Sequence, residues 1–185
     1  MIPWTQIRQT LVTWVKENAI NEDEEALPNG QVIWEDQSDQ RPAGEYASLK
    51  LISGPKRVGY DTTTNSTPDF IVSGLREFTL SVNLYRDKAL ERVSALTSGL
   101  HNPLIIEAFR AIGLAHIGES DVRDLTRPVG SRYEKRFQFD VMFRIADNIA
   151  VNPGVIEEVN AEGTVGGSIG PDINIELSVI KPEEA

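Results

Sequence analysis

The 185-residue chain has no cysteine, only two histidines and no long apolar run. Without cysteine, disulfides and thiolate chemistry are excluded. His101 and His116 are fifteen residues apart in different expected elements, so we interpret them as isolated side chains, not as metal ligands or part of a triad. No run reaches the roughly 18 apolar residues of a membrane helix, and the N-terminus lacks a signal-peptide pattern. We therefore expect a soluble protein made and kept in the cytoplasm, with no membrane partner.

Basic residues are scarce, with 18 Lys and Arg against 28 Asp and Glu and a net charge of −10. This balance argues against general nucleic-acid binding, because phosphate contacts need clustered Lys and Arg. The charge is also uneven, since residues 151–185 carry Lys181 as their one basic residue against seven acids, whereas residues 101–150 are balanced. An acidic tail could keep the chain soluble or could meet a basic region of another copy.

Motifs that carry catalysis or cofactor binding are missing. The glycine-rich stretch at 163–172, GTVGGSIGPD, lacks the GK[ST] ending of a phosphate loop, and no helix is expected after it. Residues 21–25, NEDEE, lack the glycine and terminal glutamate of an EF-hand. Asp69 and Glu134 could belong to a nuclease-like carboxylate set, which we keep as a minor alternative. We predict no catalytic residue, no cofactor and no metal ligand.

Periodicity predicts the elements of the N-terminal half. A helix begins at Pro3 or Thr5 and ends before the turn at 28–30. Its buried face is expected to carry Ile7, Leu11, Trp14 and Val15. Residues 31–36 predict a short strand, and residues 45–61 a longer one with a bulge or bend at Gly54-Pro55. The polar, threonine-rich segment 62–69 predicts an exposed loop.

The second half of the chain begins with a strongly alternating strand at 76–87, whose apolar positions are Phe78, Leu80, Val82 and Leu84. Asp87 is expected to cap a helix over 88–100, and a second helix over 103–113 begins with proline. A short strand at 114–120 and a turn at 126–131 follow.

Residues 133–145 form the last predicted strand of this region and raise the main functional question. One face belongs in a core and carries Tyr133, Phe137, Phe139, Val141, Phe143 and Ile145. The other face is polar and carries Glu134, Arg136, Gln138, Asp140, Met142 and Arg144. That second face could be a solvated surface, a binding surface or a site.

The order of elements predicts the fold class. Because strands do not alternate strictly with helices, we expect an α+β fold, a mostly antiparallel sheet with helices packed on one face. Alternating stretches at 155–159 and 173–179 flank a glycine-rich connector and predict a C-terminal β-hairpin or extended arm. We therefore divide the chain into an α+β domain at 1–150 and an acidic arm at 151–185.

Residues 1–150 resemble the tail-terminator or neck proteins of contractile-tailed phages. The resemblance is carried by the amphipathic N-terminal helix, by YASLKLISGPKRVGYD and REFTLSVNLYRD, by the helix pair around SGLHNPLIIEAFRAIGLA, and by VRDLTRPVGSRYEKRFQFDVMFRIAD. It implies a non-enzymatic virion protein that forms a ring, commonly a hexamer, on the last ring of the tail tube. Such a ring stops tube growth and presents a surface to the neck or head connector.

The resemblance also implies the partners and the location. These are further copies of the chain, the tail tube protein, the neck or head connector and, in a contractile tail, the sheath protein. The chain would lie in the tail or neck of the virion and be assembled in the cytoplasm of the bacterial host. A head-tail connector, tail-completion or sheath-attachment protein is the alternative that the sequence separates least well from a terminator.

In a protein of this class, function is expected to rest on contact surfaces. We predict that two polar strand faces make these contacts. They are the polar face of the last strand, with Arg136, Gln138, Asp140 and Arg144, and the matching face of the earlier strand, with Thr79, Asn83 and Tyr85. Two further candidates are the 54–69 segment, with Lys56, Arg57 and Tyr60, and the arm at 163–175. Plain solvated surface is the alternative for each. The charge of −10 also suggests an acidic lumen through which DNA passes without specific binding.

Overall fold

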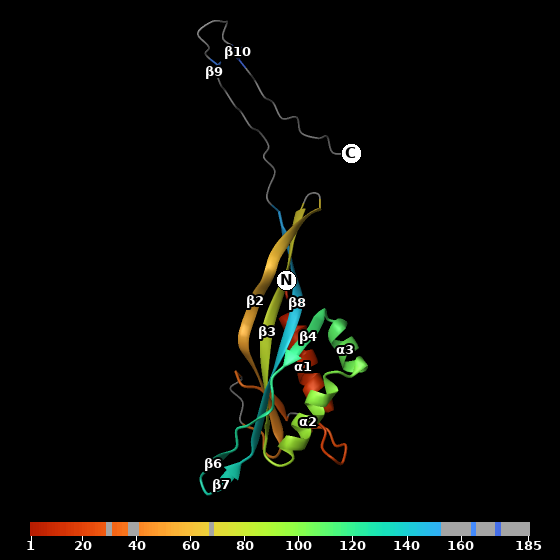
Figure 1. Cartoon of the computed structure of the whole chain (residues 1–185), viewed down its shortest axis with the longest axis vertical. Helices are drawn as coiled ribbons and strands as arrows, with labels where there is room; N and C mark the ends of the chain where they lie inside the picture. The colour runs from red at the N-terminus through yellow and green to blue at the C-terminus, as the bar shows by residue number, and fades with distance from the viewer. Residues whose placement is uncertain (29–30, 37–40, 67–68, 153–163, 166–172, 175–185) are drawn as a thin grey trace.

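The computed structural model describes residues 1–28, 31–36, 41–66, 69–152, 164–165 and 173–174. Within these ranges the chain forms a twisted six-stranded sheet, with three helices packed against one of its faces, and two small two-stranded pairs (Figure 1). The strand order is β1-β2-β3-β8-β4, and β5 pairs with β8 beyond the end of β4. All pairs are antiparallel except β1 with β2. The predicted α+β class is confirmed.

The helices are α1 (Trp4–Asn18), α2 (Ala89–Gly99) and α3 (Pro103–Arg110). The strands of the main sheet are β1 (Val32–Trp34), β2 (Tyr46–Ser66), β3 (Asp69–Tyr85), β4 (Leu114–Glu119), β5 (Arg123–Asp124) and β8 (Arg136–Val151). A separate hairpin is formed by β6 (Arg127–Val129) and β7 (Arg132–Glu134), and a second small pair by β9 (Thr164–Val165) and β10 (Ile173–Asn174).

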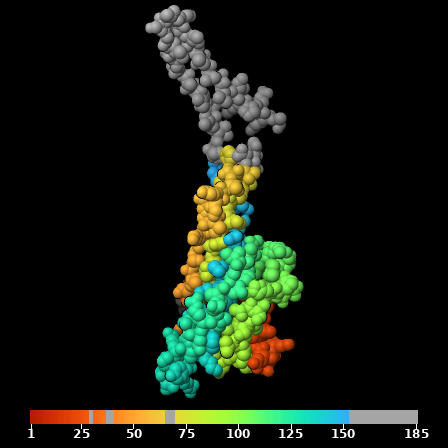
Figure 2. Space-filling model, viewed as in Figure 1, coloured from red at the N-terminus to blue at the C-terminus, as the bar shows by residue number. Residues whose placement is uncertain are grey.

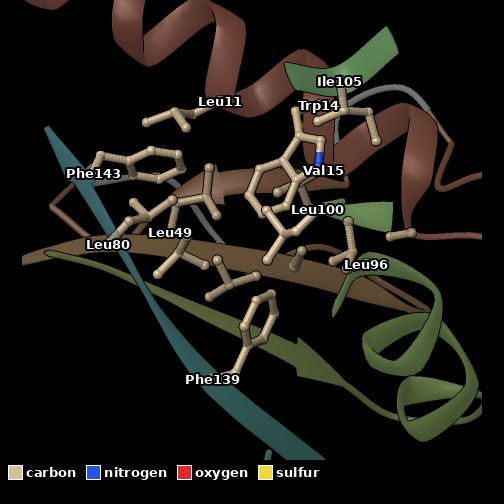
Figure 3. Close-up of a cluster of buried hydrophobic side chains, with 14 of the residues drawn as sticks. Leu11, Trp14, Val15, Leu49, Leu80, Leu96, Leu100, Ile105, Phe139 and Phe143 are labelled. Atoms are coloured by element: carbon tan, nitrogen blue, oxygen red, sulfur yellow. The ribbon is translucent and has the colours of Figure 1, made fainter. Parts of the chain in front are cut away.

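The core lies between the helices and the base of the sheet (Figure 3). The four residues predicted for the buried face of α1 are all buried there. Trp14 packs edge-on against Phe109 of α3 with ring centroids 5.6 Å apart, and Phe109 meets Phe143 of β8 at 5.3 Å. Each fully buried side chain of this size contributes about 1.5–3 kcal/mol. These contacts join α1, α3 and the sheet into one apolar unit.

Arg92 of α2 is a buried cation on the helix side, with 4% of its surface exposed. Its guanidinium donates to Glu45 Oε2 at 3.0 and 2.8 Å, to the carbonyl of Glu25 at 2.7 Å and to that of Ala19. These bonds tie the end of α1 and the following loop to α2 and to the start of β2. The helical pattern of the sequence gives no sign of this role.

Beyond the helices, β2, β3 and β8 continue as a narrow sheet (Figures 1 and 2). We call residues 58–66, 69–75 and 146–151 the distal extension. The exposed loop predicted at 62–69 is wrong, because residues up to Ser66 continue β2 and Asp69 already begins β3. Their threonines favour strand structure, and pairing with β3 supplies the partners for the backbone. The predicted bulge near Gly54-Pro55 is confirmed by register shifts between Leu51 and Lys56.

Two local predictions near the base of the sheet are wrong, and a third, the turn at 126–131, is confirmed. Asp87 does not cap α2, since the N-cap is Lys88 in the left-handed region (φ 58°) with no side-chain capping bond. Tyr133 is 78% exposed, because the chain turns away from the sheet there to form β7. Residues 126–131 do contain a turn, but it joins β6 to β7 in a hairpin that projects from the base (Figure 1).

Little of the C-terminal segment belongs to the described residues. Thr164–Val165 pairs with Ile173–Asn174 in antiparallel register, within the region expected to form a hairpin or arm. The other expected strand, Val155–Val159, lies outside the described residues, as do 166–172 and 175–185. The boundary at residue 150 stays a prediction. Among the described residues, no helix is long and apolar enough to span a membrane.

Candidate assembly surface

The face of the sheet opposite the helices carries the polar side chains that the sequence singled out. Phe139, Val141 and Phe143 of β8 are buried against the helices, so the alternating positions between and beside them point to the other face. The helix-free face therefore carries Arg136, Gln138, Asp140 and Arg144 from β8 together with Thr79, Asn83 and Tyr85 from β3. The pairs Thr79–Met142, Asn83–Gln138 and Tyr85–Arg136 lie directly opposite each other.

Asn83 lies at the centre of a polar network at the base of this face. Arg136 Nε and NH2 donate to Asn83 Oδ1 at 3.1 and 2.9 Å, and Asn83 Nδ2 donates to Glu35 Oε1 at 3.4 Å. Ser48 of β2 donates to the same Glu35 oxygen at 2.8 Å. Asn83 is 2% exposed, so it was wrongly expected to present a free surface. Its amide instead links Arg136 of β8 to Glu35, which follows β1 and also bonds to Ser48 of β2.

A second network joins β8 to β3 and β5. Gln138 Nε2 donates to Ser81 Oγ at 2.8 Å and to Asp140 Oδ1 at 3.1 Å. Asp140 Oδ2 accepts from Arg123 NH2 at 2.6 Å. Higher on the same face, Arg144 Nε donates to Glu77 Oε1 at 2.9 Å, across the β3–β8 pair. The structure thus brings the predicted polar residues of β8 together on one face. Most of their hydrogen bonds and ion pairs are made to other side chains of the same chain.

Tyr85 is also buried, with 6% of its surface exposed. Its ring stacks on Tyr46 with centroids 4.4 Å apart and an interplanar angle of 4°, and the Arg136 guanidinium lies 5.4 Å from its centroid. Burial raises the pKa of the Tyr46 hydroxyl, while the nearby Arg41 acts in the opposite direction. The prediction that Tyr85 is exposed for contact is therefore wrong, because the facing tyrosine and arginine cover it.

Of the residues predicted in the 54–69 segment, Tyr60 is the most accessible, with 93% of its surface exposed. Lys56 is also exposed. Arg57 Nε lies 3.4 Å from Asp61 Oδ2 and forms the outer end of an ion-pair ladder. All three belong to β2 and not to a loop, so they sit along the outer edge of the sheet, where a neighbour could reach them.

The ion-pair ladder crosses all three strands where the distal extension begins. Arg76 of β3 donates to both carboxylate oxygens of Asp61 at 2.7 and 3.2 Å, and its Nε lies 3.8 Å from Asp147 of β8. The hydrogen bond from Arg76 lowers the pKa of Asp61, and the same contact raises the pKa of Arg76. Gly74 makes room for the ladder, since a Cβ there would lie 1.8 Å from Asp61 Oδ1.

The distal extension carries apolar side chains on both faces, and none of the three helices in the described residues covers it. On the helix side, Phe70 faces Val151 and Val72 faces Ile149; on the other side, Leu75 lies between Val58 and Ala146. Ile71, Leu75, Ile149 and Val151 have exposed fractions of 36%, 42%, 45% and 41%. Ile71 and Leu75 lie on the helix-free side and Ile149 and Val151 on the helix side, so each face exposes apolar side chains of the kind found at contact sites. This surface was not predicted from the sequence, although Ile71 and Val72, next to the expected loop, are a visible apolar signal.

The structure bears on two earlier interpretations, the nuclease-like carboxylate set of Asp69 and Glu134 and the isolation of the two histidines. Asp69 begins β3 at the tip of the extension and Glu134 ends β7 at the base, so the proposed carboxylate set is not assembled. The two histidines are not isolated, since His116 Nε2 lies 2.8 Å and His101 Nε2 3.3 Å from the two oxygens of Glu119. In the described part of the chain, no group of three or more His, Cys, Asp or Glu side chains could hold a metal ion.

The candidate site is therefore a surface, with a polar face at the base whose side chains bond to one another and an apolar extension beyond it. No curated protein matches the chain. The family of phage neck terminator proteins matches residues 5–168, so the match runs past residue 150 as well as across the sheet and helices. It agrees with the suspected resemblance and indicates a structural role in the neck or tail of a phage virion. The chain belongs to the phage neck terminator protein family.

Proposed function

We propose that this chain forms a ring that caps the tail tube and joins the tail to the neck or head connector. The observation that carries the proposal is the distal extension, three strands with apolar side chains on both faces, over which the described part of the chain places no helix. A small sheet of this kind needs packing to be stable, so a neighbouring protein surface is the natural cover. Six copies, the ring size that the resemblance implies, would each offer the same surfaces.

The contacts of such a ring are of two kinds. Copies meet head to tail through unlike surfaces, which close into a ring when the rotation permits. The axial surfaces then meet the tail tube protein on one side and the connector on the other, with the sheath protein as a further partner in a contractile tail. Arg144 and Thr79, on the part of the helix-free face nearest the extension, are proposed contact residues, together with Lys56 and Tyr60 at the β2 edge.

The lumen of the ring would let DNA pass without specific binding. The support is the charge of −10, of which residues 151–185 supply −6 as one lysine against seven acids. The helix-free face itself carries both signs, with Arg136 and Arg144 beside Glu77 and Asp140. A strongly basic lumen in an assembled ring would contradict this part of the proposal. No catalytic step is assigned to the chain, and assembly would take place in the host cytoplasm.

Electron microscopy of particles made without this chain tests the proposal. Tails of uncontrolled length with no heads joined are expected, because nothing would stop tube growth or present the connector surface. Supplying the wild-type chain should restore both length and joining. Tails of normal length that fail to join heads would instead identify a connector, and normal virions would refute the proposal.

A further inference from the structure

We infer that the ring closes by strand pairing between the β2 edge of one copy, at residues 62–66, and the β8 edge of the next copy, at residues 146–151. The inference rests on the proposed ring and names the contact that builds it. Within the described residues, the pairing of β1 with the outer edge of β2 ends at Leu49. The pairing of β4 with the outer edge of β8 extends no further toward the tip than Ile145. Both edges of the distal extension are therefore without a strand partner among the residues that the structure describes.

These two edge segments also lack the usual protection against pairing. Native edge strands are commonly blunted by bulges, prolines and charges. The lower part of β2 has all three, with register shifts up to Thr62, the Gly54-Pro55 step, and Lys56 and Arg57. From Thr62 to Ser66 the pairing is regular and no residue is charged. On β8, residues 146–151 pair with β3 without a shift, and the single charge, Asp147, faces the helix side and lies near Arg76.

The backbone groups that point outward can be assigned. The carbonyls of Arg136 and Asp140 accept from Leu125 and Ser120, so even-numbered residues of β8 direct their backbone groups away from β3. That alternation reaches Ala146, Asn148 and Ala150, whose short side chains allow close approach. In the isolated chain the Asn148 carbonyl accepts from the amino group of Met1, which a neighbour would displace.

The strand directions favour a rotational arrangement of copies. β2 and β8 are both antiparallel to β3, so both run toward the tip of the extension. Copies related by rotation about an axis along the extension point the same way, and each then offers one β2 edge and one β8 edge in parallel orientation. A two-fold contact between two β8 edges would leave both β2 edges open and make the extensions point in opposite directions. Only the head-to-tail arrangement uses both edges in every copy.

Cysteine cross-linking tests this contact directly, because the natural chain has no cysteine. Thr64 and Ala150 face Ile71 and belong to the helix-free side, as do Asn148 and Ala146. The test chains combine T64C with A146C, N148C or A150C, which covers the neighbouring registers. Within one chain, β3 lies between positions 64 and 150, so their Cα atoms are separated by two strand spacings of about 4.8 Å, or roughly 9.6 Å in total. A disulfide needs a Cα separation below roughly 7 Å, so a bond between these positions must join two copies.

The test uses tails from phage that lack the gene and are supplied with each variant, which are then oxidised and run on non-reducing gels. At least one of the three pairs should give a ladder of covalent multimers. The control T63C with N148C should not, because its thiols lie on opposite faces. Incorporated variants with no ladder from any pair would overturn the inference. So would a covalent dimer from N148C alone, which would indicate a β8–β8 contact.

A second measurement uses the wild-type chain and does not depend on any variant assembling. Amide hydrogens of Ala146 and Ala150 should exchange at least tenfold more slowly in capped tails than in the free protein, because assembly gives them acceptors. Equal exchange in the two states overturns the inference while leaving the ring intact. Absence of the wild-type chain from tails would instead refute the proposed function.

Discussion

The carboxylate of Asp61 lies directly over the Cα of Gly74, so close that a Cβ at that position would meet Oδ1 at 1.8 Å. Gly74→Ala must therefore displace the ion pair that Asp61 makes with Arg76. We expect a lower free energy of unfolding, because the ion pair must shift to make room for the added methyl group. Hydrogen exchange should become faster in the distal extension and stay unchanged at Leu80 and Phe139. Gly54→Ala is the matched control, since nothing lies within 4 Å of a Cβ there. Equal effects of the two substitutions would contradict this role for Gly74.

The lowered pKa of Asp61 predicts that the stability of the chain depends on pH. Its pKa is lowered in the folded chain from an ordinary value of 3.8, chiefly by the hydrogen bond from Arg76. A lowered folded pKa means that the stabilisation is present above pH 3.8 and is lost as the pH falls through the folded value. The melting temperature of Asp61→Asn should therefore lie below that of the wild type at neutral pH, and the two should converge in acid. A difference that persists in strong acid, where Asp61 is protonated in the folded chain as well, would disprove the assignment.

Arg92→Met tests the buried cation that holds the helix layer to the sheet. The variant leaves Glu45 without its partner and frees the carbonyls of Ala19 and Glu25. Removing one partner of a buried pair costs about 3–5 kcal/mol. Urea unfolding measures the change. Arg110→Met is the control, because Arg110 pairs with Glu107 at an exposed position and should cost under about 1 kcal/mol. A similar small loss in both variants would show that the Arg92 network is not stabilising.

Variants of the Arg144–Glu77 pair distinguish a stabilising role of Arg144 within the chain from a contact between Arg144 and a neighbouring copy. Arg144→Glu alone places two carboxylates opposite each other and should lower stability, by about 0.2–1 kcal/mol. Adding Glu77→Arg reverses the pair and should restore the melting temperature. If this face contacts another copy, as proposed, the reversed pair should still assemble poorly in light scattering or native mass measurement. Assembly equal to the wild type would remove Arg144 from the interface.

The core and the fold class could be predicted from sequence because they depend on local periodicity. Leu11 and Trp14 repeat at helical spacing, and Phe139 and Phe143 alternate along a strand. In each case the spacing alone identifies which face of the element is buried. The shared face of Arg136 and Thr79 followed from the same alternation. These assignments needed no knowledge of what lies beside each strand.

The errors arose where the outcome depended on a partner distant in sequence. Asn83 looks exposed on a strand of alternating polarity, but Glu35 and Arg136 close over it. Thr63 looks like a loop residue until β3 pairs with it. The contacts of Arg92 with Glu45 and of His101 with Glu119 join positions that no local pattern connects. Such contacts come from tertiary structure, which overrides local propensity.

The uninterrupted β3–β8 ladder, from Phe70–Val151 at the tip to Tyr85–Arg136 at the base, has a mechanical consequence. If the neighbours at the two ends are pulled apart, a force that enters β3 at one end and leaves β8 at the other loads their hydrogen bonds in shear. The bonds then resist together and do not open one at a time, as they would if a hairpin were peeled. A neck that bears tension during infection would gain strength from one continuous ladder, and a bulge in its middle would be its weakest point.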